Sequence, residues 1–412
     1  MTISREDCLA RDVADPLAFA RARFIVPHDL IYLDGNSLGA LPATAPARLA
    51  DVVSREWGED LIRSWNKNDW IGLPARLGAR IAPLIGAGAN EVIVADSTSV
   101  NLFKLAAAAV RARAPRRVIV SEIGNFPTDL YVLQGLEDLL GGAIELRMVP
   151  RCALMDALDD SVALIALTHI HYKTGEIHDM AAIDDRAHAV GALVLWDLSH
   201  SAGAVELHLD RDGGDLAIGC GYKYLNGGPG APAFLFVARA LQPELHQPLS
   251  GWMGHDAPFD FSDRYRPAEG IARHLCGTPV VLGMAALEEG LKTFDGIRMG
   301  DIESKSAALG DLFLSLVAER CSDAGFIVSC PPSGERRGSQ VALRHPEGYA
   351  IMQALIASGV IGDFRAPDVI RFGFAPLYTR YVDVWDANHR LAEIVAQRTW
   401  QQDRFRIRAA VT

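Results

Sequence analysis

One lysine stands in an unusual setting. Lys223 lies between two tyrosines in a glycine- and proline-rich stretch, immediately before the apolar run 233–237. An amine held in an apolar, glycine-lined site loses solvation in its charged form and becomes a usable nucleophile. Of the six lysines, only Lys173 and Lys223 are expected at strand ends, while Lys104 and Lys305 fall in ordinary helical patterns. Taken alone, Lys223 better fits a turn lysine that faces water.

Two further stretches change that balance. Asp197 ends the apolar run 192–197, where a carboxylate is costly unless it is paired. Asp96-Ser97-Thr98-Ser99 follows another apolar run and opens an alanine-rich helix, and such a helix N-terminus can seat a phosphate. Each stretch could instead be a plain helix cap. A strand-end lysine, an acid for a protonated ring nitrogen and a phosphate seat are together what pyridoxal 5'-phosphate (PLP) requires.

The elements that must position these residues alternate along the middle of the chain. Short runs rich in Val, Ile and Leu are separated by helical patterns, which favours an α/β fold with a mainly parallel seven-stranded sheet. Ligands on such sheets bind at the carboxyl ends of the strands. The expected strands are 91–95, 117–121, 144–149, 162–167, 192–197, 215–219 and 233–237, and the intervening helices include 99–113, 128–140 and 179–190.

The chain length and the change of pattern near residue 286 indicate two domains. Residues 56–285 are expected to form the large domain, and 286–412 a smaller α+β domain with helices near 286–294, 302–320, 349–358 and 384–399. The loop-rich segment 1–55 is expected to join the small domain.

Composition excludes several classes of function. The formal net charge of −11 disfavours nucleic-acid binding, which needs a basic surface. No stretch of 18 or more apolar residues predicts a membrane span, and the N-terminus lacks the pattern of a signal peptide. Six cysteines without C-x-x-C spacing do not form a disulfide framework, so we expect a cytoplasmic protein.

Longer motifs carry a resemblance to a known family. The chain is similar, over nearly its whole length, to PLP enzymes of the aspartate-aminotransferase fold in the branch that includes cysteine desulfurases, and within that branch it resembles the kynureninases. FPTDLY and the pair DLSH and YKYLNGGPG are the specific motifs. The others are YLDGNSLG, SWNKNDW, DSTSVNLFK, GWMGH, CGTP and IRFGFAPLY.

The resemblance implies a role for each matching residue. Lys223 would carry PLP, Asp197 would pair with its ring nitrogen, and Tyr222 would transfer protons beside the phosphate. Arg371 would clamp the substrate carboxylate, for which a planar guanidinium is suited. Trp65 would lie near the aryl ring of the substrate. The remaining implied cofactor contacts are Thr98, Ser99, Phe126, Asp129, Thr168 and His200, with Trp252 and Thr278 reaching the phosphate of a neighbouring subunit in a homodimer.

The implied reaction is hydrolysis of L-kynurenine to anthranilate and L-alanine, with 3-hydroxykynurenine as a second substrate that the sequence does not separate. A cysteine desulfurase or aminotransferase of the same fold, and a non-catalytic PLP-binding protein, are the competing hypotheses. His169 and His171 share the spacing of zinc ligands, but no third ligand stands at metal spacing, so no metal site is expected.

Overall fold

A computed structural model describes residues 3–408 of the chain. Seven strands form one sheet in the order β4-β10-β9-β8-β7-β5-β6, in which only β10 runs against its neighbours. The strands are β4 (Val92–Val94), β5 (Val118–Glu122), β6 (Glu145–Val149), β7 (Val162–Thr168), β8 (Leu193–Asp197), β9 (Leu216–Gly219) and β10 (Phe234–Val237). All seven expected strands and the α/β fold class are confirmed.

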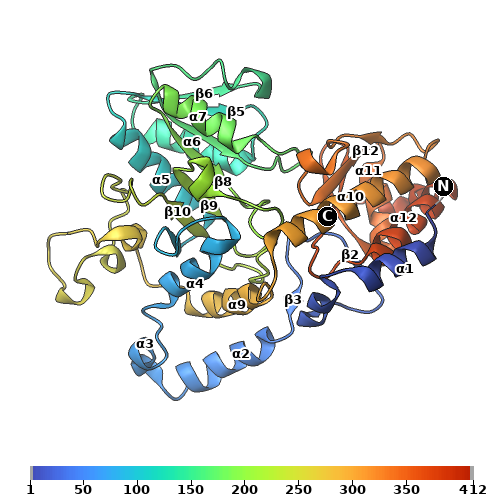
Figure 1. Ribbon diagram of the computed structural model, residues 1–412, viewed down its shortest axis with the longest axis horizontal. Helices are drawn as coiled ribbons and strands as arrows, with labels where there is room; N and C mark the ends of the chain where they lie inside the picture. Colours follow the sequence, from blue (N-terminus) through green and yellow to red (C-terminus); the bar gives the residue numbers. More distant parts are fainter. Residues whose placement is uncertain (1–2, 409–412) are drawn as a thin grey trace.

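Burial explains why these runs form strands. Every residue of β7, β8, β9 and β10 is buried, since helices cover both faces of the sheet (Figure 1). Each fully buried aliphatic side chain contributes about 1.5–3 kcal/mol. β6 differs because it is the edge strand and is only partly buried. The flanking helices α5 (Thr98–Ala112), α6 (Pro127–Leu139) and α7 (Met180–Ala189) lie within two residues of their expected bounds.

The topology brings the chemically interesting residues to one edge. Because β4, β7, β8 and β9 point the same way, their carboxyl ends lie together. Thr168 ends β7 and Asp197 ends β8, while α5 begins at Thr98 just after β4. Lys223 follows the end of β9 by four residues.

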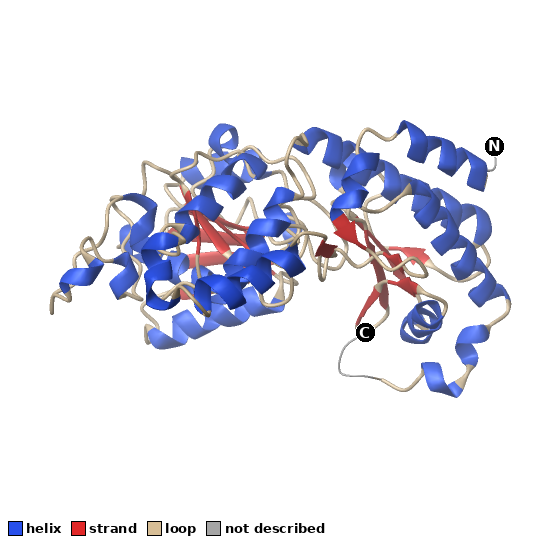
Figure 2. Ribbon diagram, turned by 90° about the horizontal axis from the view of Figure 1, so that it is seen from below, coloured by secondary structure: helices blue, strands red, loops and turns tan. Residues whose placement is uncertain are grey.

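A second, smaller sheet has the order β11-β12-β15-β14 and lies in the other lobe (Figure 2). Helices α10 and α11 pack on it, α12 packs on α10 and α11, and the N-terminal helix α1 packs on α12. The elements are α1 (Arg5–Ala14), α10 (Met299–Arg320), β11 (Ile327–Val328), β12 (Gln340–Arg344), α11 (Gly348–Ala357), β14 (Asp363–Arg365), β15 (Val369–Gly373) and α12 (Tyr381–Ala396).

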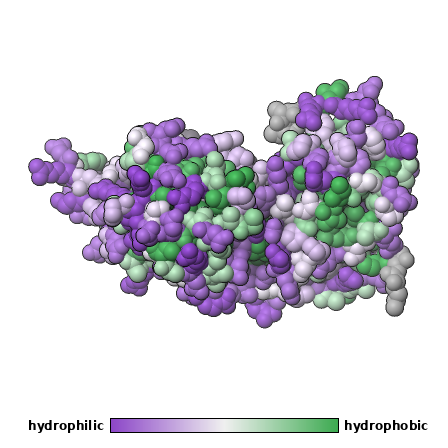
Figure 3. Space-filling model, turned by 90° about the horizontal axis from the view of Figure 1, so that it is seen from above, coloured by the Kyte–Doolittle hydropathy of each residue, from purple (hydrophilic) through white to green (hydrophobic). Residues whose placement is uncertain are grey.

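The space-filling view shows a hollow between the two lobes (Figure 3). The short N-terminal strand β2 pairs with β13, so the start of the chain contacts the small lobe. The remaining helices and strands are β1 (Phe24–Ile25), β2 (Ile31–Tyr32), β3 (Leu41–Pro42), α2 (Ala45–Asp51), α3 (Ser64–Lys67), α4 (Leu73–Ile81), α8 (Leu209–Asp212), α9 (Val281–Lys292) and β13 (Val360–Ile361).

The N-terminal segment and α9 pack into different hydrophobic cores. Cys8, Ile31 and Leu33 belong to the core of the small lobe, whereas α9 contributes Met284 and Leu287 to the core under the large sheet. The division into 1–55, 56–285 and 286–412 stays a prediction, and residues 1–2 and 409–412 lie outside the described residues. Within residues 3–408, no helix is both long and apolar enough to cross a membrane.

The lysines depart from expectation. Lys173 does not end a strand but lies in a turn five residues beyond β7. Lys104 and Lys305 are buried, although the sequence treats them as ordinary helical residues. Each ammonium is held by one carboxylate and one backbone carbonyl: Asp96 and His274 for Lys104, Asp15 and Pro376 for Lys305. Helical periodicity does not reveal these pairs because their partners lie outside the helix.

Candidate active site

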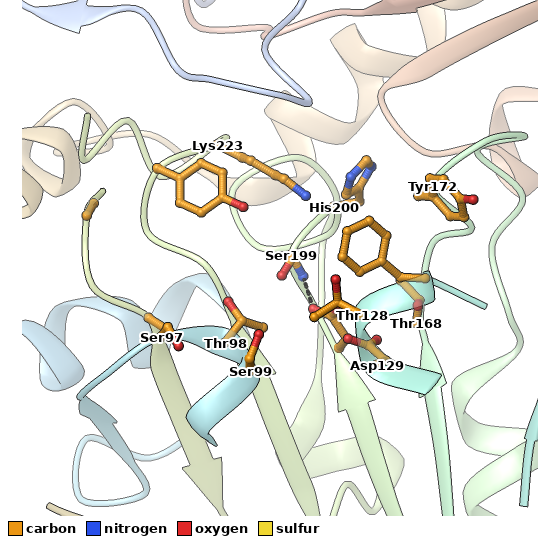
Figure 4. A pocket seen from close by; sticks show the side chains of 15 residues that line it. Ser97, Thr98, Ser99, Thr128, Asp129, Thr168, Tyr172, Ser199, His200 and Lys223 are labelled. Carbon is orange, nitrogen blue, oxygen red and sulfur yellow. Dashed lines mark hydrogen bonds between the residues drawn. The ribbon is translucent and has the colours of Figure 1, made fainter. Parts of the chain in front are cut away.

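A cavity of about 250 Å³ lies at the carboxyl edge of the large sheet (Figure 4). Nine of the predicted site residues line it: Thr98, Ser99, Phe126, Asp129, Thr168, Asp197, His200, Tyr222 and Lys223. Ligand pockets are usually about 300–1,000 Å³, so this cavity suits a small ligand. Ser97, from the predicted phosphate seat, also lines it, whereas sequence reasoning missed Thr128, Tyr172, Ser199, Ala231 and Ala233.

Lys223 presents its amine to the cavity. Its Nζ lies 5.8 Å from the centre of the Phe126 ring and 5.9 Å from that of Tyr222. Among residues 3–408 the Nζ of Lys223 has no hydrogen-bond or ion-pair partner. Figure 4 shows the amine directed toward His200 across the cavity. A lysine that no carboxylate neutralises remains available for covalent attachment to an aldehyde.

The N-terminal segment braces the loop that carries Lys223. Gly39 N donates to the carbonyl of Tyr222 at 2.9 Å. A Cβ at Gly39 would lie 2.4 Å from the carbonyl oxygen of Lys223, so no larger residue fits there without displacing the loop. The glycine that ends the YLDGNSLG motif therefore fixes the backbone of the reactive lysine.

Two carboxyl groups form the floor of the cavity. Asp197 Oδ1 accepts a hydrogen bond from Ser199 N at 2.8 Å, and Asp129 lies beside it at the start of α6. Burial, followed by the charge of Asp197, raises the pKa of Asp129 well above its usual value, although Lys223 opposes this. We infer that Asp129 keeps its proton.

Hydroxyl groups gather at the N-terminus of α5. Ser97 caps the helix by accepting from Val100 N at 3.4 Å, and Thr98 and Ser99 occupy its first turn. Asp96, just before the cap, adopts a left-handed backbone with φ +48° and is held by the buried ammonium of Lys104 at 2.7 Å. Free N–H groups, hydroxyls and the helix dipole together suit a phosphate.

Aromatic and imidazole rings form the remaining wall. Phe126 packs edge-on against Tyr172, with ring centres 5.3 Å apart. His200 Nδ1 lies 3.1 Å from Gln340 Oε1, which can only accept, so Nδ1 carries the proton. Burial, followed by the charges of Lys223 and Arg371, lowers the pKa of His200 well below its usual value. The imidazole is therefore neutral.

Thr168 forms hydrogen bonds within the protein. Its backbone N–H donates to Asn125 Oδ1 at 3.0 Å, and its hydroxyl donates to the same oxygen. Asn125 ties the end of β7 to the loop that carries Phe126. The role of Thr168 as a direct cofactor contact stays a prediction.

Arg371 lies outside the cavity wall, on β15 of the small sheet, and is buried. It forms an ion pair with Asp363, and its Nη1 donates to the carbonyl of Tyr172. Tyr172 lines the cavity, so Arg371 holds the backbone of a residue of the cavity wall. The role of Arg371 as a carboxylate clamp stays a prediction.

The other three predicted residues lie apart from this cavity. Trp65 and Thr278 line a separate, mostly apolar pocket of about 460 Å³, which we call the tryptophan pocket and which also contains Val52, Trp57, Trp70, Pro279, Val280, Val281, Leu282 and Gly283. Trp252 is 37% exposed and stacks on Phe261 with ring centres 6.4 Å apart. One chain does not bring these residues to Lys223.

The donor set of the cavity fits PLP. Lys223 can hold an aldehyde, the buried Asp129 and Asp197 can face a protonated ring nitrogen, and the α5 N-terminus can seat a phosphate. Among residues 3–408, no cluster of His, Cys, Asp and Glu could hold a metal ion. His169 instead contacts Ser201 Oγ, and His171 contacts the carbonyl of Gly124.

Comparisons with known proteins agree with this donor set. Residues 302–391 match a family model described as the kynureninase C-terminal domain. The chain is 51% identical to a kynureninase of Pseudomonas fluorescens and 52% identical to one of Burkholderia mallei strain SAVP1. Each alignment covers 99% of this chain and all of the relative.

Solved structures extend the likeness to the fold. A C-DES mutant with glycine covalently linked to the PLP cofactor matches with a TM-score of 0.78 at 17% identity, covering 90% of this chain and 99% of that one. The cysteine desulfurase CsdA of Escherichia coli matches with a TM-score of 0.75 at 20% identity, covering 92% and 98%. At such low identity these two matches bear on the architecture alone.

Proposed function

The chain belongs to the kynureninase family, and we propose that it is a PLP-dependent enzyme that hydrolyses L-kynurenine to anthranilate and L-alanine. The observation that carries this proposal is the convergence of Lys223, Asp197 and the α5 N-terminus on one cavity. The family relatives, aligned over 99% of the chain, support the choice of kynurenine over the substrates of other enzymes with this fold. 3-Hydroxykynurenine is a second substrate of the same chemical class.

PLP, when bound, supplies the electron sink that stabilises the carbanion left by removal of the α-proton. Lys223 would hold the cofactor, and Asp197, with the protonated Asp129 beside it, would keep the ring nitrogen charged. Thr98 and Ser99 would bind the phosphate. Phe126 and the neutral His200 would flank the ring, and Thr168 would contact it from the end of β7.

Side chains of this chain bind the substrate and transfer the protons of the reaction. Arg371 binds the α-carboxylate and so fixes which substituent of the α-carbon faces Lys223. Lys223 Nζ takes the α-proton as general base. Water adds to the side-chain ketone, and cleavage of the Cβ–Cγ bond releases anthranilate. Burial raises the pKa of Tyr222 above its usual range, so its phenol keeps a proton that it can deliver to Cβ.

The active form is a homodimer. Trp252 and Thr278 lie away from the cavity of their own chain, and the tryptophan pocket exposes a contiguous apolar surface. In a second copy, Trp252 and Thr278 would reach the phosphate and Trp65 the aryl ring of the substrate. The six cysteines are all unpaired, which supports a cytoplasmic location.

Product analysis tests this function. Purified enzyme supplied with PLP should release anthranilate and L-alanine in equal amounts from L-kynurenine, followed by anthranilate fluorescence and amino-acid analysis. L-cysteine serves as the control substrate, because a desulfurase of the same fold would release sulfide and alanine from it. Sulfide without anthranilate would replace the proposed function. Cofactor absorbance with no turnover of any amino acid would indicate a binding protein.

A further inference from the structure

The hairpin formed by β14 and β15 places a carboxylate directly opposite Arg371. Asp363 and Arg371 are partners in the antiparallel register, so their side chains stand on the same face of the small sheet. Arg371 Nε donates to Asp363 Oδ1 at 2.7 Å, and Nη2 donates to Oδ2. Both residues are buried, with 2% of each exposed.

Counting donors shows what this pair leaves for a ligand. A guanidinium has five N–H groups in a fixed plane. Asp363 takes the Nε–H and one N–H of Nη2, and the carbonyl of Tyr172 takes one N–H of Nη1. One N–H therefore remains on each of Nη1 and Nη2. The remaining N–H of Nη2 lies at the end of the guanidinium, beside Nη1, and this end edge can receive a carboxylate.

Asp363 is itself held in place. Ser37 Oγ donates to its Oδ2 at 2.8 Å, and Arg365 Nη2 lies 2.8 Å from the same oxygen. Burial opposes ionisation of Asp363, but the hydrogen bonds and charge of Arg371 outweigh it and hold the pKa of Asp363 below its usual value. Asp363 is therefore a permanent anion with three fixed partners.

The same arginine is tied to the cavity wall. The carbonyl of Tyr172 also accepts from Gln340 Nε2 at 3.1 Å, and Gln340 Oε1 contacts His200. Arg371 and Gln340 of the small lobe thus both donate to the backbone carbonyl of Tyr172, while the ring of Tyr172 packs on Phe126. A rotation of Arg371 would shift a carboxylate relative to the Lys223 amine.

We propose that Asp363 is a positioning residue, which closes the side edge of Arg371 and forces the substrate carboxylate onto the end edge. This inference rests on the proposed function, because it takes Arg371 to bind the α-carboxylate. Without Asp363 the carboxylate could bind the Nε edge, and the α-proton would no longer face Lys223. The substrate would then still bind, but it would react slowly.

The test is a split between kcat and KM in the PLP-loaded enzyme. Asp363→Asn should lower kcat for L-kynurenine by about 10- to 100-fold, the usual effect of misplacing a reacting group by about 1 Å. KM should change by less than about threefold, because the carboxylate still binds Arg371 through two N–H groups. Cofactor absorbance should be unchanged. Asp368→Asn is the matched control, since Asp368 pairs with Arg344 on the exposed part of the same sheet.

Each outcome decides. An intact kcat in Asp363→Asn would overturn the inference, whether KM stays the same or rises tenfold. If that variant does not fold, Ser37→Ala decides: losing one hydrogen bond to Asp363 should lower kcat about two- to fivefold at constant KM, and an unchanged kcat would overturn the inference. A wild-type enzyme that releases no anthranilate would instead overturn the proposed function.

Discussion

The cavity around Lys223 and the tryptophan pocket differ in how far one chain completes them. The cavity collects groups from several strand ends and the N-termini of two helices, and its lining residues include acids, hydroxyls and an amine. The tryptophan pocket is lined almost entirely by apolar side chains, with Thr278 among the few polar ones. The difference teaches that one chain assembles the reactive groups, whereas the contacts proposed for Trp65, Trp252 and Thr278 would need a second copy.

The largest expected effect comes from the cavity. Lys223→Ala should lower kcat at least ~1,000-fold, because it removes both the anchor and the general base. It should also abolish the absorbance near about 420 nm expected of PLP attached to a lysine. Lys305→Ala controls for loss of a buried lysine outside the site, and it should keep the band. A band that survives in Lys223→Ala would place the anchor elsewhere.

Subunit mixing tests whether the two regions combine across a dimer. Lys223→Ala and the double variant Trp252→Ala with Thr278→Ala should each have little activity alone. Random mixing makes half of the molecules heterodimers, each with one intact site, so about a quarter of wild-type activity should return. Activity is measured by anthranilate release after exchange of subunits. No recovery, in a preparation shown to contain heterodimers, would contradict sharing of the site.

Trp65 tests the recognition side of the comparison. Trp65→Ala should raise KM for L-kynurenine about tenfold with a smaller change in kcat, since lost aryl contacts cost about 1–3 kcal/mol. Trp400→Ala, in the small lobe, is the matched control and should leave KM unchanged. Equal effects of the two substitutions would show that the tryptophan pocket does not meet the substrate.

The smallest expected effect is a pH dependence near the Arg371 clamp. Burial, followed by the charge of Asp363, raises the pKa of Asp34 to about 7. Below that pH, protonated Asp34 leaves Arg365, Arg371 and Asp363 with one net positive charge for the substrate. Ionisation at higher pH cancels this charge, so KM should rise a few-fold as pH increases from 6 to 8, roughly as for one nearby charge at an effective dielectric of about 20.

Asp34→Asn should flatten that profile while kcat keeps its own pH dependence. The other polar groups that interact with Asp34 are Ser37, which lowers its pKa, and the phenols of Tyr32, Tyr224 and Tyr378. Burial raises the pKa of each phenol, so none ionises between pH 6 and 8. A KM profile in Asp34→Asn that still rises with pH would assign the effect to another group.

Sequence reasoning succeeds where local pattern and topology coincide. The apolar runs before Asp197 and after Lys223 locate their strands within one residue, because strands that are buried on both faces form unbroken apolar runs. Parallel topology then brings Thr98 and Asp197 to one edge. The reasoning misses pairs set by tertiary contact, such as Asp363 with Arg371. Their positions on either side of the turn at Ala366-Pro367 are the signal that could have found them.

The residues that are proposed to act across a homodimer are a different case. Motif wording predicts roles for Trp65, Trp252 and Thr278, but neither periodicity nor strand order brings them to Lys223. Lys104 shows a related limit, since its two partners depend on the left-handed backbone at Asp96 and on the distant carbonyl of His274. Long-range contacts decide these positions.

Chemical trapping of the cofactor addresses the central claim most directly. Borohydride reduction of the PLP-loaded enzyme, followed by peptide mass analysis, should place a single cofactor label on the peptide that contains Lys223. A label on Lys173 or on any other lysine, or a protein without label, would contradict the account.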